Sequence, residues 1–397
     1  MYSLRPYQIS ILELMKADFT NFGNSIIVAP TGSGKSLLIA SLANWLNQNV
    51  LIICYTKEIL DQNKEKLSQI IPKEEIGIYS ASFNSKEIKK YTLATIGSIY
   101  KHPELFTVFK VVLIDELHTV PHKKTSSMYI KFLKQIGSPK VYGFSGTPYR
   151  CENWGERLSN GYILSHTVTK LVNRCMNPFW SRIIISLTTQ SLIDEGYLCQ
   201  PTYIDKELIP RQELKPNASH SDFDLTGFQK KLLERENELL TILEWANSTH
   251  RHTLVFCVSV AQAEHLSSLV NGSAVVSAKT PKKIRTKIIH GFKLGLIKTV
   301  FNVNCLTTGF DFPALDCIVV CRPTNSIGLH VQMLGRGMRN APGKKTCDII
   351  DLVGNVKKLG KAETIRVERV NGQWEIVSET GCWHNKELYS YTIKQNT

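Results

Sequence analysis

Residues 25–40 of this 397-residue sequence combine a glycine-rich loop, a lysine and a hydroxyl group in an arrangement that can hold a nucleoside triphosphate. The stretch reads SIIVAPTGSGKSLLIA, with a strand-like apolar run before the loop and a helix-like apolar run after it. Backbone N–H groups of such a loop curl around phosphates, and the helix dipole adds partial positive charge. Lys35 can reach the β- and γ-phosphates, and the Ser36 hydroxyl can ligate Mg²⁺. The predicted binding loop comprises Thr31, Gly32, Ser33, Gly34, Lys35 and Ser36.

The loop departs from the strict GxxxxGK[ST] pattern at one position. Ala29 stands where the first glycine is usual, and the turn tolerates this exchange of one small residue for another. A glycine-rich turn with an incidental lysine would read in the same way. The interpretation as a phosphate loop therefore needs a partner carboxylate elsewhere in the chain.

The run FKVVLIDELHTV supplies that carboxylate. Val111–Ile114 reads as a buried strand, and Asp115 and Glu116 emerge at its carboxyl end, where ligands bind in parallel α/β sheets. Asp115 can hold the Mg²⁺ shell, and Glu116 can orient or deprotonate an attacking water. A solvated acidic turn is the alternative, and the phosphate loop upstream makes it much weaker.

The elements that must position these residues alternate between strands and helices. Further strand-and-loop units are NVLIICYTKEILDQNKEKL, YTLATIGSIY and KVYGFSGTPYR, and in the second half RHTLVFCVSVAQAEHLSSLV, KTVFNVNCLTTGFDFP and LDCIVVCRP. This alternation predicts an α/β protein with mostly parallel sheets covered by helices on both faces.

The second half of the chain contains no second phosphate loop. Instead, the stretch QMLGRGMR places Gln332 before two arginines, Arg336 and Arg339, whose spacing of three predicts that they share one helical face. Guanidinium groups can stabilise charge that develops on a γ-phosphate, which is the arginine-finger role. A helix with exposed arginines paired to surface acids is the alternative.

Composition restricts the class of protein. The formal net charge is +14 and the hydrophobic content is 43%, which favour a folded protein with a polyanionic partner. Ten cysteines are scattered without a CxxC pair, so neither a disulfide framework nor a zinc ribbon is indicated, and we expect reduced thiols in an intracellular protein. Because no apolar run approaches membrane-spanning length and no signal peptide is visible, we expect a soluble chain.

Six motifs in a fixed order resemble those of superfamily-two helicases. They are LRPYQ, APTGSGKS, DELH, SGTP, TTGFD and QMLGRGMR, and the resemblance runs from Leu4 to Val356. The chain looks most similar to the DEAD/DEAH-type group with XPB-, RecG- and UvsW-like DNA motors, and especially to its compact phage and bacterial members. The resemblance implies two tandem RecA-like lobes with ATP in the cleft between them. We expect lobes at residues 1–200 and 201–360 and a small tail with a β-hairpin at 361–397.

The resemblance also assigns roles to individual residues. It implies that Arg5 and Gln8 contact adenine, and that His118 links the ATP cleft to the SGT motif. Arg5 and Gln8 also suit a plain helix start with Pro6 in the first turn. The remaining implied roles are coupling for Ser145 and Thr147, nucleotide sensing for Gly309 and Asp311, and nucleic-acid contact for Thr56, Lys57, Thr95, Gly97, Ser259, Thr307 and Thr308.

Three further stretches admit two interpretations each. In NRCMNPFWSR, Phe179 and Trp180 between arginines could stack on bases or be buried against their own lobe, and we favour burial. SAKTPKKIRTKIIHGFK could follow a nucleic-acid track or form a solvated basic helix. The tail ETIRVERVNGQWEIVSE alternates like a hairpin around Asn371-Gly372, without the cysteine-rich zinc module common in relatives.

The sequence thus predicts an ATP- and Mg²⁺-dependent DNA helicase or translocase that moves 3′→5′ on forked or branched DNA in replication, recombination or repair. A DNA-translocating motor subunit of a defence or restriction complex and an RNA helicase are the alternatives. We expect a monomer without a membrane partner, in the cytoplasm of a bacterial or phage-infected cell, with replication or recombination proteins as possible partners.

Overall fold

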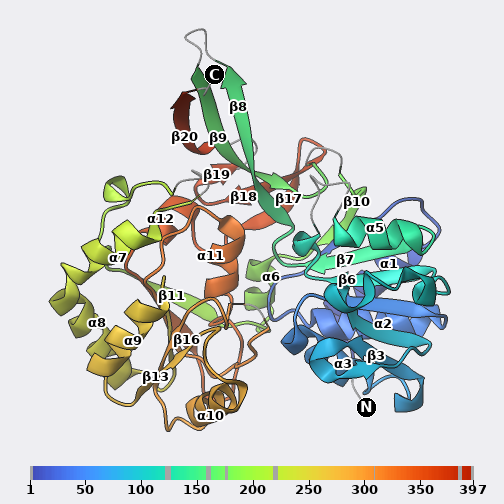
Figure 1. Ribbon diagram of the computed structural model, residues 1–397, viewed down its shortest axis with the longest axis horizontal. Coiled ribbons are helices and arrows are strands. Elements are labelled where there is room, and N and C mark those ends of the chain that lie inside the picture. Colours follow the sequence, from blue (N-terminus) through green and yellow to red (C-terminus); the bar gives the residue numbers. More distant parts are fainter. Residues whose placement is uncertain are drawn as a thin grey trace. The chain divides into compact units, whose positions relative to one another are not determined.

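The computed structural model describes residues 3–120, 127–157, 162–174, 178–217, 222–307, 309–382 and 387–394. The chain divides into two compact units (Figure 1). The first unit consists of Met1–Arg150, Lys170–Thr188 and Val367–Trp374, and the second of Cys151–Thr169, Thr189–Arg366 and Glu375–Thr397. Each unit is built on its own sheet.

The first unit contains an eight-stranded sheet in which all pairs but one are parallel. In spatial order its strands are β10 (Arg182–Ser186), β1 (Ser25–Val28), β7 (Lys140–Ser145), β6 (Val111–Asp115), β2 (Val50–Cys54), β5 (Tyr91–Thr95), β3 (Ile76–Ser80) and β4 (Ser85–Lys86). Strands β1, β2 and β6 are buried along their whole length, as expected for strands covered on both faces.

The helices of the first unit lie on the two faces of this sheet. They are α1 (Pro6–Asp18), α2 (Lys35–Leu46), α3 (Lys57–Leu67), α4 (Ile96–Ile99) and α5 (Met128–Gln135). Because crossovers between parallel strands are right-handed, α2 and α3, whose connections run from β1 towards β3, share one face. The connections through α4 and α5 run back towards β7, which places them on the other face. Contacts of α2 with α3 and of α4 with α5 agree with this division.

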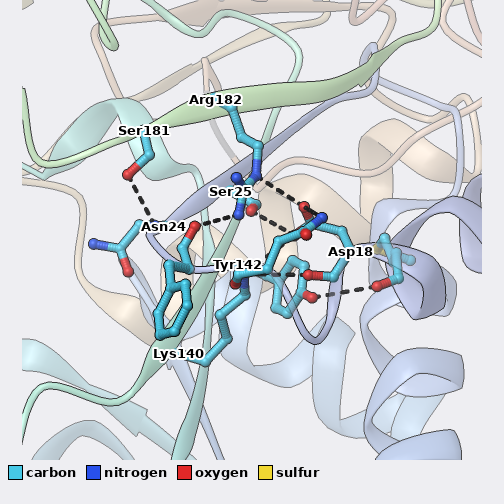
Figure 2. A network of polar contacts seen from close by, with 10 residues as sticks. Asp18, Asn24, Ser25, Lys140, Tyr142, Ser181 and Arg182 are labelled. Atoms are coloured by element: carbon cyan, nitrogen blue, oxygen red, sulfur yellow. Dashed lines mark hydrogen bonds and ion pairs between the residues drawn. The ribbon is translucent and has the colours of Figure 1, made fainter.

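The amino-terminal edge of the same sheet is held by a buried carboxylate, Asp18, at the end of α1 (Figure 2). Its side chain accepts a hydrogen bond from Ser25 Oγ at 2.6 Å and forms ion pairs with Lys140 at 3.2 Å and Arg182 at 2.8 Å. Burial alone would raise the pKa of Asp18, but hydrogen bonds from Ser25 and Asn21 and the charge of Lys140 hold it below its ordinary value. Asp18 therefore ties α1 to β1, β7 and β10.

The second unit contains a six-stranded sheet whose pairs are all parallel. In spatial order its strands are β11 (Gln200–Asp205), β16 (Thr346–Asp351), β15 (Cys317–Val320), β12 (Thr253–Phe256), β14 (Thr299–Asn302) and β13 (Ser273–Val276). Its helices are α6 (Thr189–Asp194), α7 (Leu225–Leu233), α8 (Glu236–Thr249), α9 (Val260–Leu269), α10 (Lys282–Lys293), α11 (Ile327–Leu334) and α12 (Asn355–Leu359). The directions of the crossovers place α7, α8 and α9 on one face and α10 and α11 on the other.

The remaining strands form two small sheets. One contains β17 (Arg366–Val370), β18 (Gln373–Ser378) and β19 (Gly381–Cys382), and the other contains β20 (Glu387–Lys394), β9 (Tyr162–Leu171) and β8 (Tyr149–Arg157). Asn371 and Gly372 between β17 and β18 have φ of 50° and 80°, as the predicted Asn-Gly turn requires. None of the helices in the described part of the chain has the length and hydropathy needed to cross a bilayer.

The predicted fold class is confirmed: two tandem RecA-like lobes on mostly parallel sheets, with a small C-terminal hairpin. Because parallel strands end at one edge, the residues that follow β1, β7 and β6 are brought together in the first unit. The residues after β2, β5 and β3 lie further along the same edge.

Candidate active site

The phosphate loop joins the carboxyl end of β1 to the start of α2. Gly32 and Gly34 have φ of 86° and 78°, a region that residues with a Cβ rarely adopt. A Cβ on Gly34 would also lie only 2.5 Å from Gln8 Nε2. Both glycines are therefore required by the backbone geometry that lets a loop of this kind cradle phosphate.

Lys35, the first residue of α2, turns back towards the loop. Its ammonium group donates hydrogen bonds to the carbonyls of Ala29 and Pro30, each at 3.2 Å. Thr31 and Ser36 are half-buried, in the loop and in the first turn of α2. The cation thus lies within the curve of the loop, where phosphate binding would need it.

The start of α1 docks on the loop through the carbonyl of Ser33. Gln8 Nε2 and the Tyr7 hydroxyl both donate to this oxygen, at 3.0 and 2.8 Å. The Arg5 backbone N–H donates to Gln8 Oε1 at 3.0 Å, and the Arg5 guanidinium donates to the Tyr7 hydroxyl at 3.2 Å. The structure thus joins Arg5 and Gln8 to the phosphate loop. The sequence prediction missed Tyr7, whose only signal is its place within LRPYQ.

The two predicted carboxylates follow one another at the end of β6. Asp115 is 4% exposed; its Oδ1 accepts from the Glu116 N–H at 2.9 Å and its Oδ2 accepts from Asn63 Nδ2 at 2.8 Å. Glu116 leaves the strand with φ 55° and ψ 56°, an uncommon conformation for a residue with a side chain that is retained where its surroundings enforce it. Asn63 comes from α3, and no sequence motif signals it.

Electrostatics at this edge suit a divalent cation. Burial raises the pKa of the Asp115 carboxyl to about 6, and the neighbouring charge of Glu116 adds to this effect, while Lys35 and Asn63 oppose it. The hard oxygens of Asp115 and Ser36, at the carboxyl edge of one sheet, are ligands that Mg²⁺ prefers. The residues present therefore fit a nucleotide-bound Mg²⁺.

The predicted coupling residues form one hydrogen-bonded cluster with Glu116. His118 lies in the turn η4 (Leu117–Thr119), and its Nδ1 is 2.8 Å from Ser145 Oγ and 3.4 Å from Glu116 Oε2. Ser145 Oγ donates to Glu116 Oε2 at 3.3 Å and accepts from the Thr147 N–H at 3.0 Å. Burial lowers the pKa of His118 despite the Glu116 charge, which favours the neutral imidazole. The cluster thus joins Glu116 by hydrogen bonds to Ser145 at the end of β7.

In the second unit, Arg336 and Arg339 converge on the segment that follows β14. Arg336 is 5% exposed; its Nε donates to the Thr307 carbonyl at 2.9 Å and its Nη1 to the Phe310 carbonyl at 2.7 Å. Arg339 forms an ion pair with Asp311. Burial lowers the pKa of Arg339 to about 10, which leaves the guanidinium charged at pH 7.

The prediction that both arginines share a helical face is wrong. Helix α11 contains Gln332 but ends at Leu334, and both arginines follow it in non-helical backbone. Glycines at 335 and 337 explain the early end, because glycine is a poor helix former. Tertiary contacts bring the two guanidiniums together instead. Gly309 has φ 72°, consistent with the turn that presents Asp311.

Comparison with known proteins agrees with this division into two helicase units. Residues 1–150 match the family described as "Type III restriction enzyme, res subunit", and residues 234–341 match "Helicase conserved C-terminal domain". The chain belongs to the superfamily-two helicases.

Curated relatives are about one quarter identical to this chain over the aligned residues. "Putative ATP-dependent helicase IRC3" of Saccharomyces cerevisiae is 25% identical over 82% of this chain and 47% of the relative. "DNA 3'-5' translocase XPB2" of Sulfurisphaera tokodaii is 26% identical over 85% of this chain and 78% of the relative. The chain therefore spans about half the length of the yeast protein.

Among solved structures, the helicase resembles a fragment of a "putative HsdR subunit of a type I restriction enzyme from Vibrio vulnificus YJ016". The TM-score is 0.66 at 18% identity, covering 91% of this chain and 66% of that one. At this identity the likeness concerns the fold alone, and it agrees with the two RecA-like lobes.

The predicted nucleic-acid contacts of the first helicase unit follow β2 and β5, which are neighbours in the sheet. Thr56 caps α3, because its Oγ1 accepts from the Ile59 N–H at 3.3 Å. Lys57 donates to the Ser82 carbonyl at 3.1 Å and lies 4.7 Å from the Phe83 ring centroid. The Thr56 hydroxyl thus has a structural role as well.

A cluster of hydroxyls continues from this point along the helicase sheet edge. Thr95 Oγ1 lies 3.2 Å from Ser80 Oγ and 2.9 Å from Ser98 Oγ. A Cβ on Gly97 would meet nothing within 4 Å, so the backbone there is open. Main-chain N–H groups and hydroxyls of this kind suit phosphate contacts that carry no sequence information.

The predicted contacts of the second helicase unit follow β12 and β14. Ser259 caps α9, accepting from the Gln262 N–H at 3.1 Å, and donates to Gln229 Oε1 at 2.7 Å. Thr307 is 7% exposed. Thr308 lies outside the described residues.

The two aromatic residues between arginines have different environments. Trp180 is fully buried, and a Cβ on Gly143 would lie 2.3 Å from its ring. Phe179 is half-buried and packs edge-on against Trp180 at 5.1 Å between centroids. The favoured interpretation, burial against the chain's own lobe, is confirmed for Trp180.

Proposed function

We propose that this helicase couples ATP hydrolysis to 3′→5′ movement along DNA and acts on forked or branched DNA. The observation that carries the proposal is the hydrogen-bonded cluster of Glu116, His118, Ser145 and Thr147. A plain nucleotide-binding domain needs only the loop and a metal-binding carboxylate. A motor also requires a connection from the residue that orients the attacking water to the rest of the unit, and the hydrogen bond between Ser145 at the end of β7 and Glu116 provides one.

We assign a task in hydrolysis to each residue of the candidate site in the first unit. The Lys35 ammonium and the loop N–H groups hold the phosphates, and Tyr7 and Gln8 fix the loop at Ser33 from the adenine side. Glu116 orients the attacking water and accepts its proton. Ser36 and Asp115 would hold Mg²⁺, which supplies charge neutralisation at the phosphates.

The second unit contributes the positive charge needed during hydrolysis. We assign Arg336 and Arg339 as arginine fingers, with Gly309 and Asp311 sensing the nucleotide and Gln332 assisting. Because Arg336 donates to the carbonyls of Thr307 and Phe310, its movement would pull directly on the predicted nucleic-acid segment. The assignment therefore connects nucleotide state to DNA contact within one unit.

In this proposal the protein contacts DNA through the phosphates of the backbone. The caps formed by Thr56 and Ser259 leave the remaining amino-terminal N–H groups of α3 and α9 available to an anion. Lys57, Thr95, Gly97, Thr307 and Thr308 complete the proposed track. Contacts of this type bind any sequence.

The experiment that tests the proposal is steady-state ATP hydrolysis without nucleic acid and with single-stranded DNA, duplex DNA, forked DNA or single-stranded RNA. Stimulation that is greatest with forked DNA and lost in Glu116→Gln supports the proposal. Stimulation by RNA alone would replace it with an RNA helicase. Unwinding of forks with 3′ or 5′ tails then tests the direction.

A second candidate is the DNA-translocating motor subunit of a restriction or defence complex. It is favoured by the match of residues 1–150 to the restriction-enzyme res-subunit family and by the fold shared with the HsdR fragment. This role predicts translocation along duplex DNA without strand separation. Displacement of a triplex-forming oligonucleotide without unwinding of a fork would favour it over a role in replication, recombination or repair.

A further inference from the structure

The segment between Glu264 and Asp311 has an unusual charge pattern. It contains no aspartate or glutamate. It contains seven basic residues, Lys279, Lys282, Lys283, Arg285, Lys287, Lys293 and Lys298. Since the chain as a whole has 34 acids among 397 residues, such a run of acid-free sequence concentrates positive charge in one place.

The structure places this charge on the surface of α10 and its two flanking loops. All six lysines are exposed, whereas Arg285 is half-buried and donates to the Ser277 carbonyl at 3.0 Å. Within the described part of the chain, none of these seven lysine and arginine residues forms an ion pair. Arg285 therefore serves the fold, and the lysines remain available to an external anion.

The lysines are distributed along the helix rather than gathered at one end. Lys282 and Lys293 are the first and last residues of α10, so at 1.5 Å per residue they are about 16 Å apart along its axis. Phosphates of one DNA strand follow each other at about 3.4 Å along the duplex axis. The helix can thus face about five successive phosphates.

The aromatic residues of the segment indicate which form of DNA fits. Its only aromatic residues are Phe292, Phe301 and Phe310, and all three are buried. Surfaces that bind single strands combine cations with exposed aromatics on which bases stack. A cationic surface without them suits a duplex, whose bases are already stacked and whose backbone alone is presented.

The position of α10 connects this surface to the proposed DNA track. The loop that leads into α10 follows β13, which lies beside β14 in the sheet, and the Val303 N–H donates to the Val276 carbonyl at 3.0 Å. Lys279 and Lys282 therefore emerge at the same carboxyl edge as Val303, from which the chain leads on to Thr307. From there α10 runs back towards the opposite edge on the face of the sheet that also carries α11 (Figure 1).

We propose that the exposed lysines of α10 and its preceding loop form a second DNA-binding surface, which holds the backbone of duplex DNA next to the strand track. This inference rests on the proposed DNA motor function and extends it from the strand that is followed to the duplex arm of a fork. Lysine ammonium groups act as point charges, so the surface binds any sequence.

The test compares the triple variant Lys282→Ala, Lys283→Ala, Lys287→Ala with a control of equal net charge, Lys16→Ala, Lys66→Ala, Lys89→Ala. Each control lysine is already ion-paired with a glutamate in the first unit. Fluorescence anisotropy gives the affinity for a 20-base-pair duplex and for single-stranded DNA between 50 and 200 mM salt. If each of the three α10 lysines neutralises one phosphate, the slope of log affinity for duplex against log salt falls in magnitude by about 2.7.

The expected result is this loss of slope for duplex with single-strand affinity and single-strand-stimulated ATP hydrolysis within about twofold of wild type. An α10 variant with the same duplex slope as the control would overturn the inference, and so would an equal loss for both DNA forms. Wild-type protein that binds no DNA would instead refute the proposed function itself. Thermal unfolding checks that the variants fold, which we expect because all substituted lysines are on the surface.

Discussion

Each unit has its own parallel sheet, but the first unit carries acidic side chains at the carboxyl edge, whereas the second carries arginines near the amino edge. In the first unit the edge carries Asp115 and Glu116, held by Asn63 and by the cluster around Ser145. In the second unit, Arg336 and Arg339 are tied to backbone carbonyls and to Asp311, and their segment lies beside Leu198 and Cys199, just before the amino end of β11. Similar sheets thus present carboxylate oxygens of the kind that suit a metal in one unit and buried, hydrogen-bonded positive charge in the other.

The two units also differ in the connections that follow β1 and β12. After β1, glycines at 32 and 34 allow the left-handed backbone of a phosphate loop. After β12 the chain reads Cys257, Val258 and Ser259 and enters α9 directly, with no room for a phosphate loop. The loop geometry that suits phosphate is therefore present after β1 and absent from the described connection after β12.

The largest expected effect comes from removing a guanidinium of the second unit. We expect Arg339→Ala to lower kcat for ATP hydrolysis by about 10³–10⁵-fold, as for other arginine fingers, while nucleotide affinity changes little. Steady-state kinetics and fluorescent-nucleotide binding measure the two quantities. Arg235→Ala is the matched control, since it removes an exposed arginine of the same unit that pairs with nearby Glu238 on the surface. A kcat of Arg339→Ala within tenfold of wild type would contradict the division of labour between the units.

The next largest effect is expected from the water-orienting carboxylate of the first unit. Glu116→Gln should lower kcat by about 10²–10⁴-fold, because an amide cannot accept the proton. The amide can still accept a hydrogen bond from Ser145, so the fold and ATP binding should persist. Single-turnover hydrolysis gives the rate and thermal unfolding checks the fold; unchanged turnover would exclude Glu116 as the base.

A smaller effect is expected from substitution of Asn63, which hydrogen-bonds to Asp115. Asn63→Ala removes the side chain that donates to Asp115 Oδ2, and we expect the Mg²⁺ requirement of ATP hydrolysis to rise about 10–100-fold. Titration of activity with Mg²⁺ measures it. Gln69→Ala, an exposed change just after the same helix, should leave the requirement unaltered. Equal Mg²⁺ curves for both variants would show that Asp115 does not depend on Asn63.

The last prediction concerns Asp18, at the amino-terminal edge of the first sheet, where we expect a substitution to change stability and leave catalysis unaltered. Asp18→Ala breaks a buried ion pair and should lower the free energy of unfolding by about 3 kcal/mol with kcat per folded molecule unchanged. Because the folded pKa of Asp18 lies below its ordinary 3.8, its stabilisation is present above that value and is lost as pH falls below it. Urea unfolding at pH 7 and pH 3.5 should show a smaller difference between variant and wild type at pH 3.5. A constant difference would mean that the charge of Asp18 contributes nothing.

Prediction from sequence succeeded where function depends on local backbone. The phosphate loop, the strand ending in Asp115 and the Asn371-Gly372 turn each require particular residues within a few positions, and the structure contains all three. It failed where residues meet through the fold. Spacing placed Arg336 and Arg339 on one helical face, yet α11 ends before both of them.

Sequence alone determined the class of this protein, its alternating α/β architecture and the residue types at its site, because glycines, buried strands and ordered motifs impose local geometry. Tertiary structure alone decided which side chains cooperate. Tyr7 reaches Ser33, Asn63 reaches Asp115 across 52 positions, and the α10 lysines remain free of acidic partners within the described residues. The physical reason is that hydrogen bonds and ion pairs depend on distance in space, and only the crossovers of the sheet bring these distant residues within reach.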